Sequence, residues 1–148
     1  MLQAGLLWFV ALPLQVGEYL GGQNSWNVFD ACGAIVWLVG FSFETIGDWQ
    51  LARFRANPTN AGQVCDRGLW RLTRHPNYFG DFCVWWGFYL IAAASGAWWT
   101  IASPLLMSYF LLKVSGVNLL ESTIVERRPA YREYMARTNA FFPGLPRS

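Results

Sequence analysis

Charged residues are scarce in this sequence. Asp, Glu, Lys and Arg make up 14% of its 148 residues, whereas soluble domains carry roughly 25%. Hydrophobic residues make up 54% and aromatic residues 18%. The apolar residues also gather in blocks of near-bilayer length instead of amphipathic patterns. This composition argues against a soluble domain and predicts an integral membrane protein.

Several binding motifs are missing as well. The three cysteines, Cys32, Cys65 and Cys83, have no metal-type spacing, so we expect neither a disulfide framework nor a metal site. The sequence has no G-x-G-x-x-G loop and no G-x-x-x-x-G-K-[ST] loop, so a phosphate group must be held in another way. Most of the aromatic residues lie inside the apolar blocks and not among the cations. A nucleic-acid partner is therefore not expected.

Four apolar blocks predict membrane-spanning helices, because about 20 helical residues cross the hydrocarbon core of a bilayer. The blocks cover about residues 2–20, 28–49, 78–94 and 98–114. No alternating strand pattern suggests a barrel. The predicted fold class is therefore an all-α integral membrane protein with about four spans in one domain. Residues 119–148 would form a cytoplasmic tail with an interfacial helix.

The cations predict the orientation of these spans. All eleven Lys and Arg residues lie after residue 52, in the connection from Arg53 to Arg74, at Lys113, and in the tail from Arg127 to Arg147. The other two connections contain no Lys or Arg. The positive-inside rule then places both termini in the cytoplasm. In a bacterium the bilayer would be the plasma or inner membrane.

Acidic side chains accompany the arginines at the end of the second predicted span. Glu44 and Asp48 are four residues apart, and Arg55 lies seven beyond Asp48, so all three project from one stripe of a helix. Charged groups inside a membrane cost roughly 3 kcal/mol each and are normally paired or functional. The stripe is either a set of ionic neighbours at a helix end or a polar groove in which Arg55 binds an anionic group.

The stretch "RHPNYFGD" predicts the start of the third span. Pro76 suits the first turn of a helix because it lacks an N–H group, and His75 or a neighbour would be the cap. The first two turns would carry Asn77, Tyr78 and Asp81. The free N–H groups at a helix start favour an anion, and Arg74 lies just before them. This pattern favours a diphosphate ligand, with a lipid phosphate as the alternative.

The tail begins with Glu121 at the end of the fourth span and continues as a helix until "FFPGLP" breaks it. Tyr131 and Tyr134 are three residues apart on that helix. One interpretation is an interfacial helix that lies against lipid headgroups. The other is a helix that closes over a bound cofactor at the cytoplasmic mouth.

Three motifs in order carry a resemblance to a known family. "ETIGDWQLARFR", "GLWRLTRHPNYFGDFCVWWG" and "ERRPAYREYMARTNAFFPG" together resemble the C-terminal half of the DUF1295 family, whose relatives are the steroid 5α-reductases and sterol reductases. The resemblance covers about residues 28 to 146, and the first span is also similar to the preceding span of that family. The "RHP-x-Y-x-G" core alone is shared with isoprenylcysteine carboxyl methyltransferase-like proteins.

The resemblance implies an NADPH site. Asp48 and Arg55 match the acid and the arginine that hold the nucleotide in the steroid reductases, and Asn77 and Asp81 match the polar pair near the nicotinamide end. Asp81 departs from the glutamate usual in relatives, so its contact is shifted by about one methylene. Further cofactor-binding candidates are Glu44, Arg74, His75, Tyr78 and Glu121.

The activity implied by the resemblance is reduction of a carbon–carbon double bond conjugated to a carbonyl, in a steroid-like or other lipid-like substrate. Family members are longer, and the tyrosine and glutamate that engage the carbonyl come from earlier spans, so no catalytic residue is assigned. If the chain is complete, we expect nucleotide binding without efficient turnover, unless oligomerisation closes the pocket. The alternatives are an S-adenosylmethionine-dependent methyltransferase of the isoprenylcysteine type and a non-enzymatic small membrane protein.

Overall fold

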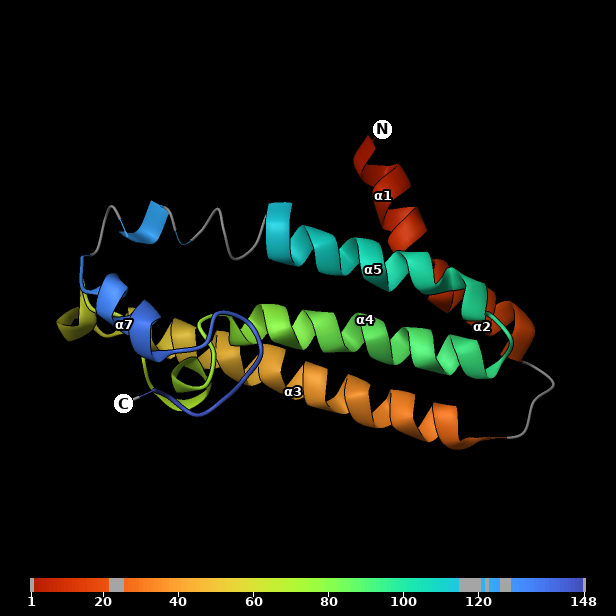
Figure 1. The fold of residues 1–148 in the computed structure, drawn as a ribbon, viewed down its shortest axis with the longest axis horizontal. Coiled ribbons are helices and arrows are strands. Elements are labelled where there is room, and N and C mark those ends of the chain that lie inside the picture. The colour runs from red at the N-terminus through yellow and green to blue at the C-terminus, as the bar shows by residue number, and fades with distance from the viewer. Residues whose placement is uncertain (1, 22–25, 115–120, 122, 126–128, 148) are drawn as a thin grey trace. The chain divides into compact units, whose positions relative to one another are not determined.

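The computed structural model describes residues 2–21, 26–114, 121, 123–125 and 129–147, and this part of the chain contains helices and no strands. The all-α prediction is therefore confirmed. The α-helices are α1 (Leu2–Val10), α2 (Leu12–Gly21), α3 (Val28–Ala56), α4 (Pro76–Ala94), α5 (Ala102–Tyr109) and α7 (Tyr131–Arg137) (Figure 1). Short helices of other types are η1 (Pro58–Asn60), η2 (Gly68–Arg71), η3 (Trp98–Ile101) and the π-helix η4 (Phe110–Val114).

The chain divides into two compact units. The first comprises Met1–Phe41 and Phe82–Tyr109, and the second comprises Ser42–Asp81 and Phe110–Ser148. The long helices α3 and α4 are each divided between the two units. The polar residues singled out in the sequence lie in the second unit.

Glycines set the packing of α3 against α4 in the first unit. A Cβ atom added to Gly87 would lie 2.7 Å from the backbone nitrogen of Trp37, and one added to Gly33 would lie 2.7 Å from the Cγ1 atom of Ile91. Both distances are shorter than a carbon atom tolerates, so the two backbones approach each other only because these positions lack side chains. Small residues at helix crossings are typical of membrane helices.

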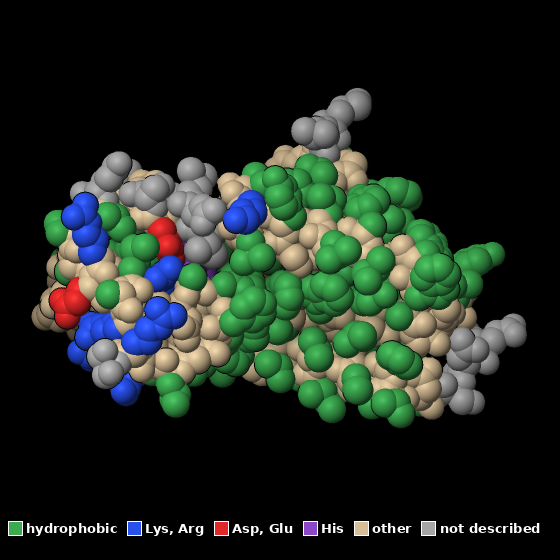
Figure 2. Space-filling model, in the orientation of Figure 1, with side chains coloured by type: hydrophobic (Ala, Val, Ile, Leu, Met, Phe, Trp, Pro, Cys, Tyr) green, Lys and Arg blue, Asp and Glu red, His purple; other side chains and the backbone are tan. Residues whose placement is uncertain are grey.

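The first unit exposes much of its apolar surface. Leu38, Trp98 and Leu105 are more than half exposed, and hydrophobic side chains cover the visible face of α4 and α5 (Figure 2). Large contiguous apolar surfaces are rare on soluble monomers and mark contact with lipid or another protein.

The helices agree only in part with the predicted spans. By length and composition, α3 is the one described helix that meets the requirement for crossing a membrane by itself. Residues 3–10 and 12–21 meet it together as a bent pair with an angle of 42°. The bend precedes Pro13, which has no N–H group to continue the helical hydrogen bonds.

The fourth predicted span is not one continuous α-helix. Residues 98–101 form η3, residues 102–109 form α5, and residues 110–114 form η4. Pro104, in the first turn of α5, fits only near a helix start. The count of four spans is therefore not confirmed, and the orientation of the termini stays a prediction.

The tail forms a short helix and then folds back on the rest of the second unit. The helix α7 ends at Arg137, and the rest of the tail folds back onto the segment before α4. The N–H group of Arg74 donates to the carbonyl of Asn139 at 2.9 Å, and that of Gly144 donates to the carbonyl of Leu72 at 3.0 Å. Tyr131 and Tyr134 are buried, so these two side chains do not face outward, and the interfacial position of the helix stays a prediction.

Candidate functional site: a polar cavity in the second unit

The ends of two helices place the first pair of site residues. Gly47 on α3 brings that helix close to the start of α4, because a Cβ atom there would lie 3.2 Å from the Cγ atom of Pro76. This approach lets the Nδ2 group of Asn77 donate to Oδ1 of Asp48 at 3.0 Å. Arg55 follows two turns later on α3.

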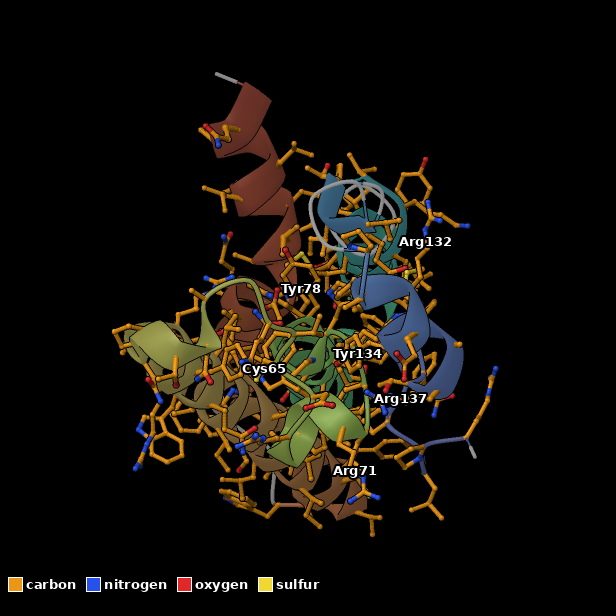
Figure 3. The ribbon with its side chains drawn as sticks, turned by 90° about the vertical axis from the view of Figure 1, so that its left-hand side faces the viewer. Cys65, Arg71, Tyr78, Arg132, Tyr134 and Arg137 are labelled. Carbon is orange, nitrogen blue, oxygen red and sulfur yellow. The ribbon has the colours of Figure 1, made fainter. Side chains whose placement is uncertain are left out.

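These residues open onto a cavity of about 520 Å³, a size within the usual range for small-molecule sites. Its walls come from the end of α3, the loop before α4, the first turn of α4 and the tail. The lining residues are Asp48, Leu51, Phe54, Arg55, Val64, Cys65, Trp70, Arg74, His75, Asn77, Tyr78, Ile124, Tyr131 and Tyr134. In Figure 3, Cys65, Tyr78 and Tyr134 surround this space, while Arg71, Arg132 and Arg137 lie toward the periphery.

A buried ionic cluster closes one side of the cavity. The Nε and Nη2 groups of Arg74 donate to the two carboxylate oxygens of Glu121 at 2.7 and 3.1 Å. The Nε2 atom of His75 lies 3.0 Å from Oε1 of the same carboxylate. The three side chains are at most 11% exposed. We call these three residues the Arg74 cluster.

The Arg74 cluster also holds the tail in place. The Nη1 group of Arg74 donates to the carbonyls of Met135 at 2.8 Å and Thr138 at 3.2 Å. Burial alone would raise the pKa of Glu121, but the hydrogen bond from His75 and the positive charge of Arg74 outweigh it and lower the pKa. The carboxylate is therefore ionised near neutral pH, and the side chain of Arg74 donates four hydrogen bonds to groups of the protein.

Two tyrosines from α7 complete the wall. The hydroxyl of Tyr134 donates to the carbonyl of Trp70, which fixes α7 to η2. The rings of Tyr131 and Tyr134 pack together with centroids 5.4 Å apart. Burial raises the pKa of both phenols, to about 12 for Tyr131, so both remain neutral hydrogen-bond donors.

The charges that remain available to a ligand lie on α3. Arg55 is exposed and makes no hydrogen bond or ion pair within the described part of the chain. Asp48 is also exposed and accepts its hydrogen bond from an uncharged amide. Because Arg74 is already neutralised by Glu121, Arg55 is the cation of the cavity lining that can bind an anionic group.

The structure brings most of the predicted site residues together. Asp48, Arg55, Arg74, His75, Asn77 and Tyr78 line the cavity. Glu121 lies behind the wall as the partner of Arg74, and the lining does not include Glu44 or Asp81. Arg74 and His75, two of the predicted cofactor-binding residues, are buried and bonded to Glu121; their contact with a cofactor stays a prediction.

Sequence reasoning missed several lining residues. Cys65 and Trp70 line the cavity from the connection before α4, but Arg74 and His75 were the residues of that connection predicted to belong to the site. Burial raises the pKa of the Cys65 thiol, so it lines the cavity as a neutral group. No spacing or composition signal marks either residue, because their place depends on how the loop folds onto α7.

Comparison with known proteins places this architecture in a family. Residues 1–138 match the family described as "Protein of unknown function (DUF1295)". The chain belongs to the DUF1295 family. The resemblance carried by the three motifs is thereby confirmed at the level of the family.

Two curated fungal proteins are similar to this DUF1295 chain. "Uncharacterized protein C594.04c" of Schizosaccharomyces pombe is 27% identical over 161 aligned residues, which cover 94% of this chain and 46% of that protein. "Probable O-methyltransferase ustE" of Ustilaginoidea virens is 34% identical over 80 residues, covering 54% of this chain and 28% of that protein. The chain thus spans less than half the length of these relatives. No solved structure matches it significantly.

Proposed function

We propose that this chain is the cofactor-binding part of an NADPH-dependent membrane reductase that acts on conjugated double bonds of a steroid-like or other lipid-like enone. The observation that carries the proposal is the joint placement of Asp48, Arg55 and Asn77 on one cavity, with Asp48 and Asn77 hydrogen-bonded at 3.0 Å. These are three of the positions to which the reductase resemblance assigns nucleotide contacts.

The chemistry of the cavity fits the cofactor. NADPH, when bound, supplies the hydride for the double bond. Arg55, whose guanidinium has no partner among the described residues, suits a phosphate group, since bidentate contact with phosphate is typical of arginine. Asp48 offers a carboxylate for ribose hydroxyl groups, and its bond from Asn77 fixes its orientation. Buried aromatic side chains such as Tyr134 form part of the remaining wall.

The lipid bilayer is part of this proposal. Helix α3 is long and apolar enough to cross a membrane, and the first unit exposes large apolar side chains such as Trp98. A substrate that partitions into lipid would reach the cavity from the membrane. We propose an integral membrane location with both termini in the cytoplasm, as the distribution of cations predicts.

A second candidate function is methyl transfer from S-adenosylmethionine. It is favoured by the name of the Ustilaginoidea virens relative, a probable O-methyltransferase. A ribose-binding carboxylate such as Asp48 suits either cofactor, because both contain adenosine. The two differ in charge: NADPH carries phosphates that need Arg55, whereas S-adenosylmethionine carries a sulfonium cation and no phosphate.

Parallel calorimetric titrations distinguish the candidates. Detergent-purified protein is titrated with NADPH, NADH and S-adenosylmethionine, and the same titrations are repeated with Arg55→Gln. We expect NADPH to bind and the substitution to weaken binding by about 10- to 150-fold, the range for a lost hydrogen bond to a charged group. Arg53→Gln is the matched control, because Arg53 is on the same helix but lines a neighbouring groove and not this cavity.

Each alternative outcome has a distinct meaning. Binding of S-adenosylmethionine without NADPH would replace the reductase by the methyltransferase. Equal NADPH affinity for the wild type and Arg55→Gln would remove Arg55 from the site. If none of the three compounds binds, the proposal of a cofactor-binding chain is wrong.

A further inference from the structure

A second groove, of about 510 Å³, lies on a different face of the end of α3. All of its lining residues belong to the second unit. Among the described residues that line it there are two arginines, Arg53 and Arg67, and no Asp or Glu. Neither guanidinium forms an ion pair with a described residue. The groove therefore carries two exposed positive charges that are available to an anionic ligand.

The loop that carries Arg67 is held against α3. The backbone N–H group of Leu69 donates to Oε1 of Gln50 at 3.0 Å. Gly68 permits this close approach, because its φ is +59° and an added Cβ atom would lie 2.5 Å from Nε2 of Gln50. Packing of the loop on the helix thus brings Arg67 to the groove that Arg53 also lines.

Two amide side chains of the groove have donors left over. Oε1 of Gln50 accepts from Leu69, and Oδ1 of Asn57 accepts from the N–H and hydroxyl groups of Thr59 at 3.1 and 2.8 Å. The NH₂ groups of both amides donate to no described residue. The groove therefore offers amide and guanidinium donors, which suit the oxygens of a phosphate group.

The face of α3 that leads to the groove is apolar. Ile46, Trp49 and Arg53 are spaced i, i+3 and i+7, so they share one face of the helix. Ile46 is 43% exposed and Trp49 is 58% exposed, and the guanidinium carbon of Arg53 lies 5.5 Å from the centroid of the Trp49 ring. The face changes from aliphatic through aromatic to cationic at the end of a helix long and apolar enough to cross a membrane. Acyl chain, interface and phosphate follow in the same order along a phospholipid, and Trp is typical of the interface.

We propose that this groove binds the headgroup phosphate of an anionic phospholipid. Arg53 and Arg67 contact the phosphate oxygens, and the acyl chains lie along the face that exposes Ile46. A soluble phosphate compound would use the same cations but would leave this apolar face uncovered. The inference rests on the proposed membrane location of α3 and is independent of the proposed reductase activity.

Native mass spectrometry of the detergent-purified chain provides the test, because each bound lipid appears as a separate mass. The probes are dioleoylphosphatidylglycerol, dioleoylphosphatidylcholine, which has the same acyl chains but no net charge, and glycerol phosphate, which has no acyl chain. Each is titrated into the wild type, Arg53→Gln, Arg67→Gln and the double variant. Arg71→Gln is the matched control, because Arg71 is exposed in the same connection but lines neither this groove nor the cavity.

We expect each single substitution to weaken phosphatidylglycerol binding about 5-fold and the double substitution about 25-fold, since one cation near a lipid headgroup contributes about 1 kcal/mol. Arg71→Gln should leave this affinity unchanged. Gln50→Glu keeps an oxygen for the N–H group of Leu69 but replaces the free NH₂ group by a charged oxygen, so it should also weaken binding. Phosphatidylcholine and glycerol phosphate should both bind the wild type more weakly than phosphatidylglycerol.

Other results overturn the inference. An equal loss in Arg71→Gln would show diffuse attraction to a basic surface. Glycerol phosphate binding as tightly as phosphatidylglycerol would assign the groove to a soluble phosphate compound. Equal binding of the two lipids, unaffected by the substitutions, would show that only acyl chains are recognised. Weaker NADPH binding by Arg53→Gln or Arg67→Gln would make the groove part of the cofactor site.

The proposed function and this inference fail separately. If the wild type binds phosphatidylglycerol as expected but does not bind NADPH, the cofactor proposal is wrong and the lipid site stands. If it binds NADPH but no phosphatidylglycerol, the lipid site is wrong and the cofactor proposal stands. Melting temperatures of the variants confirm that each is folded before its affinities are compared.

Discussion

Replacing Glu121 tests whether the Arg74 cluster holds the tail against the cavity. Glu121→Leu removes the carboxylate that accepts two hydrogen bonds from Arg74 and one contact from His75. The guanidinium then remains buried with only the carbonyls of Met135 and Thr138 as partners. Removing one partner of a buried ion pair costs about 3–5 kcal/mol. For a chain of this length, that loss lowers the melting temperature by about 6–20 °C.

A double-mutant cycle separates the ion pair from simple packing. Arg74→Met should cost a similar amount, because it leaves the Glu121 carboxylate buried with His75 as its remaining partner. The double variant Arg74→Met/Glu121→Leu has no buried unpaired charge from this pair. Its loss of unfolding free energy should therefore be about 2–3 kcal/mol smaller than the sum of the losses in the two single variants. Thermal unfolding followed by near-ultraviolet circular dichroism gives all four values. Additive single effects within about 0.5 kcal/mol would refute the coupling.

A second assay follows the tail directly. Since Arg74 bonds to carbonyls of α7 and of the residue after it, loss of the cluster should free this segment at temperatures where the rest of the protein is folded. Limited proteolysis with trypsin should then cut after Arg137 faster in Glu121→Leu than in the wild type. An unchanged cleavage rate would show that other contacts, such as the bond from Thr73 to the carbonyl of Phe141 at 2.8 Å, hold the tail by themselves.

Three further predictions follow from the contacts described above. The lowered pKa of Glu121 means that its ionised form stabilises the folded state above the ordinary pKa of 4.5, and this contribution is lost as pH falls below 4.5; unfolding measured from pH 7 to 3 should show a steeper loss in the wild type than in Glu121→Gln. Gly87→Ala should cost about 1–3 kcal/mol because its Cβ atom would meet the backbone of α3, whereas Gly5→Ala, which has open space, should leave the melting temperature unchanged or raised. Cys65 should react with a maleimide more slowly in the folded protein than after denaturation, because the thiol is buried and its pKa is raised; equal rates would contradict its place in the cavity wall.

Local sequence patterns were sufficient for much of the second unit. The i, i+7 spacing of Asp48 and Arg55 on a helix predicted that both face one groove, and both line the cavity. Pro76 predicted the start of the next helix, and α4 begins at that residue. Such inferences succeed because helical periodicity and the missing N–H group of proline act within a few residues. They place Asn77 at a helix start, but they do not show that it reaches Asp48.

The tertiary structure decided how the charges are used. Arg74 and Glu121 are 47 residues apart, and no local pattern indicates that one neutralises the other. Their pairing leaves Arg55 as the cation of the cavity lining that remains available to a ligand. The tail tyrosines illustrate the same limit, because their spacing fits an interfacial helix as well as a buried one. The sequence by itself therefore determined that the chain is helical and which polar side chains the site can use, while long-range packing decided which of those residues meet at the cavity and which of them hold the tail in place.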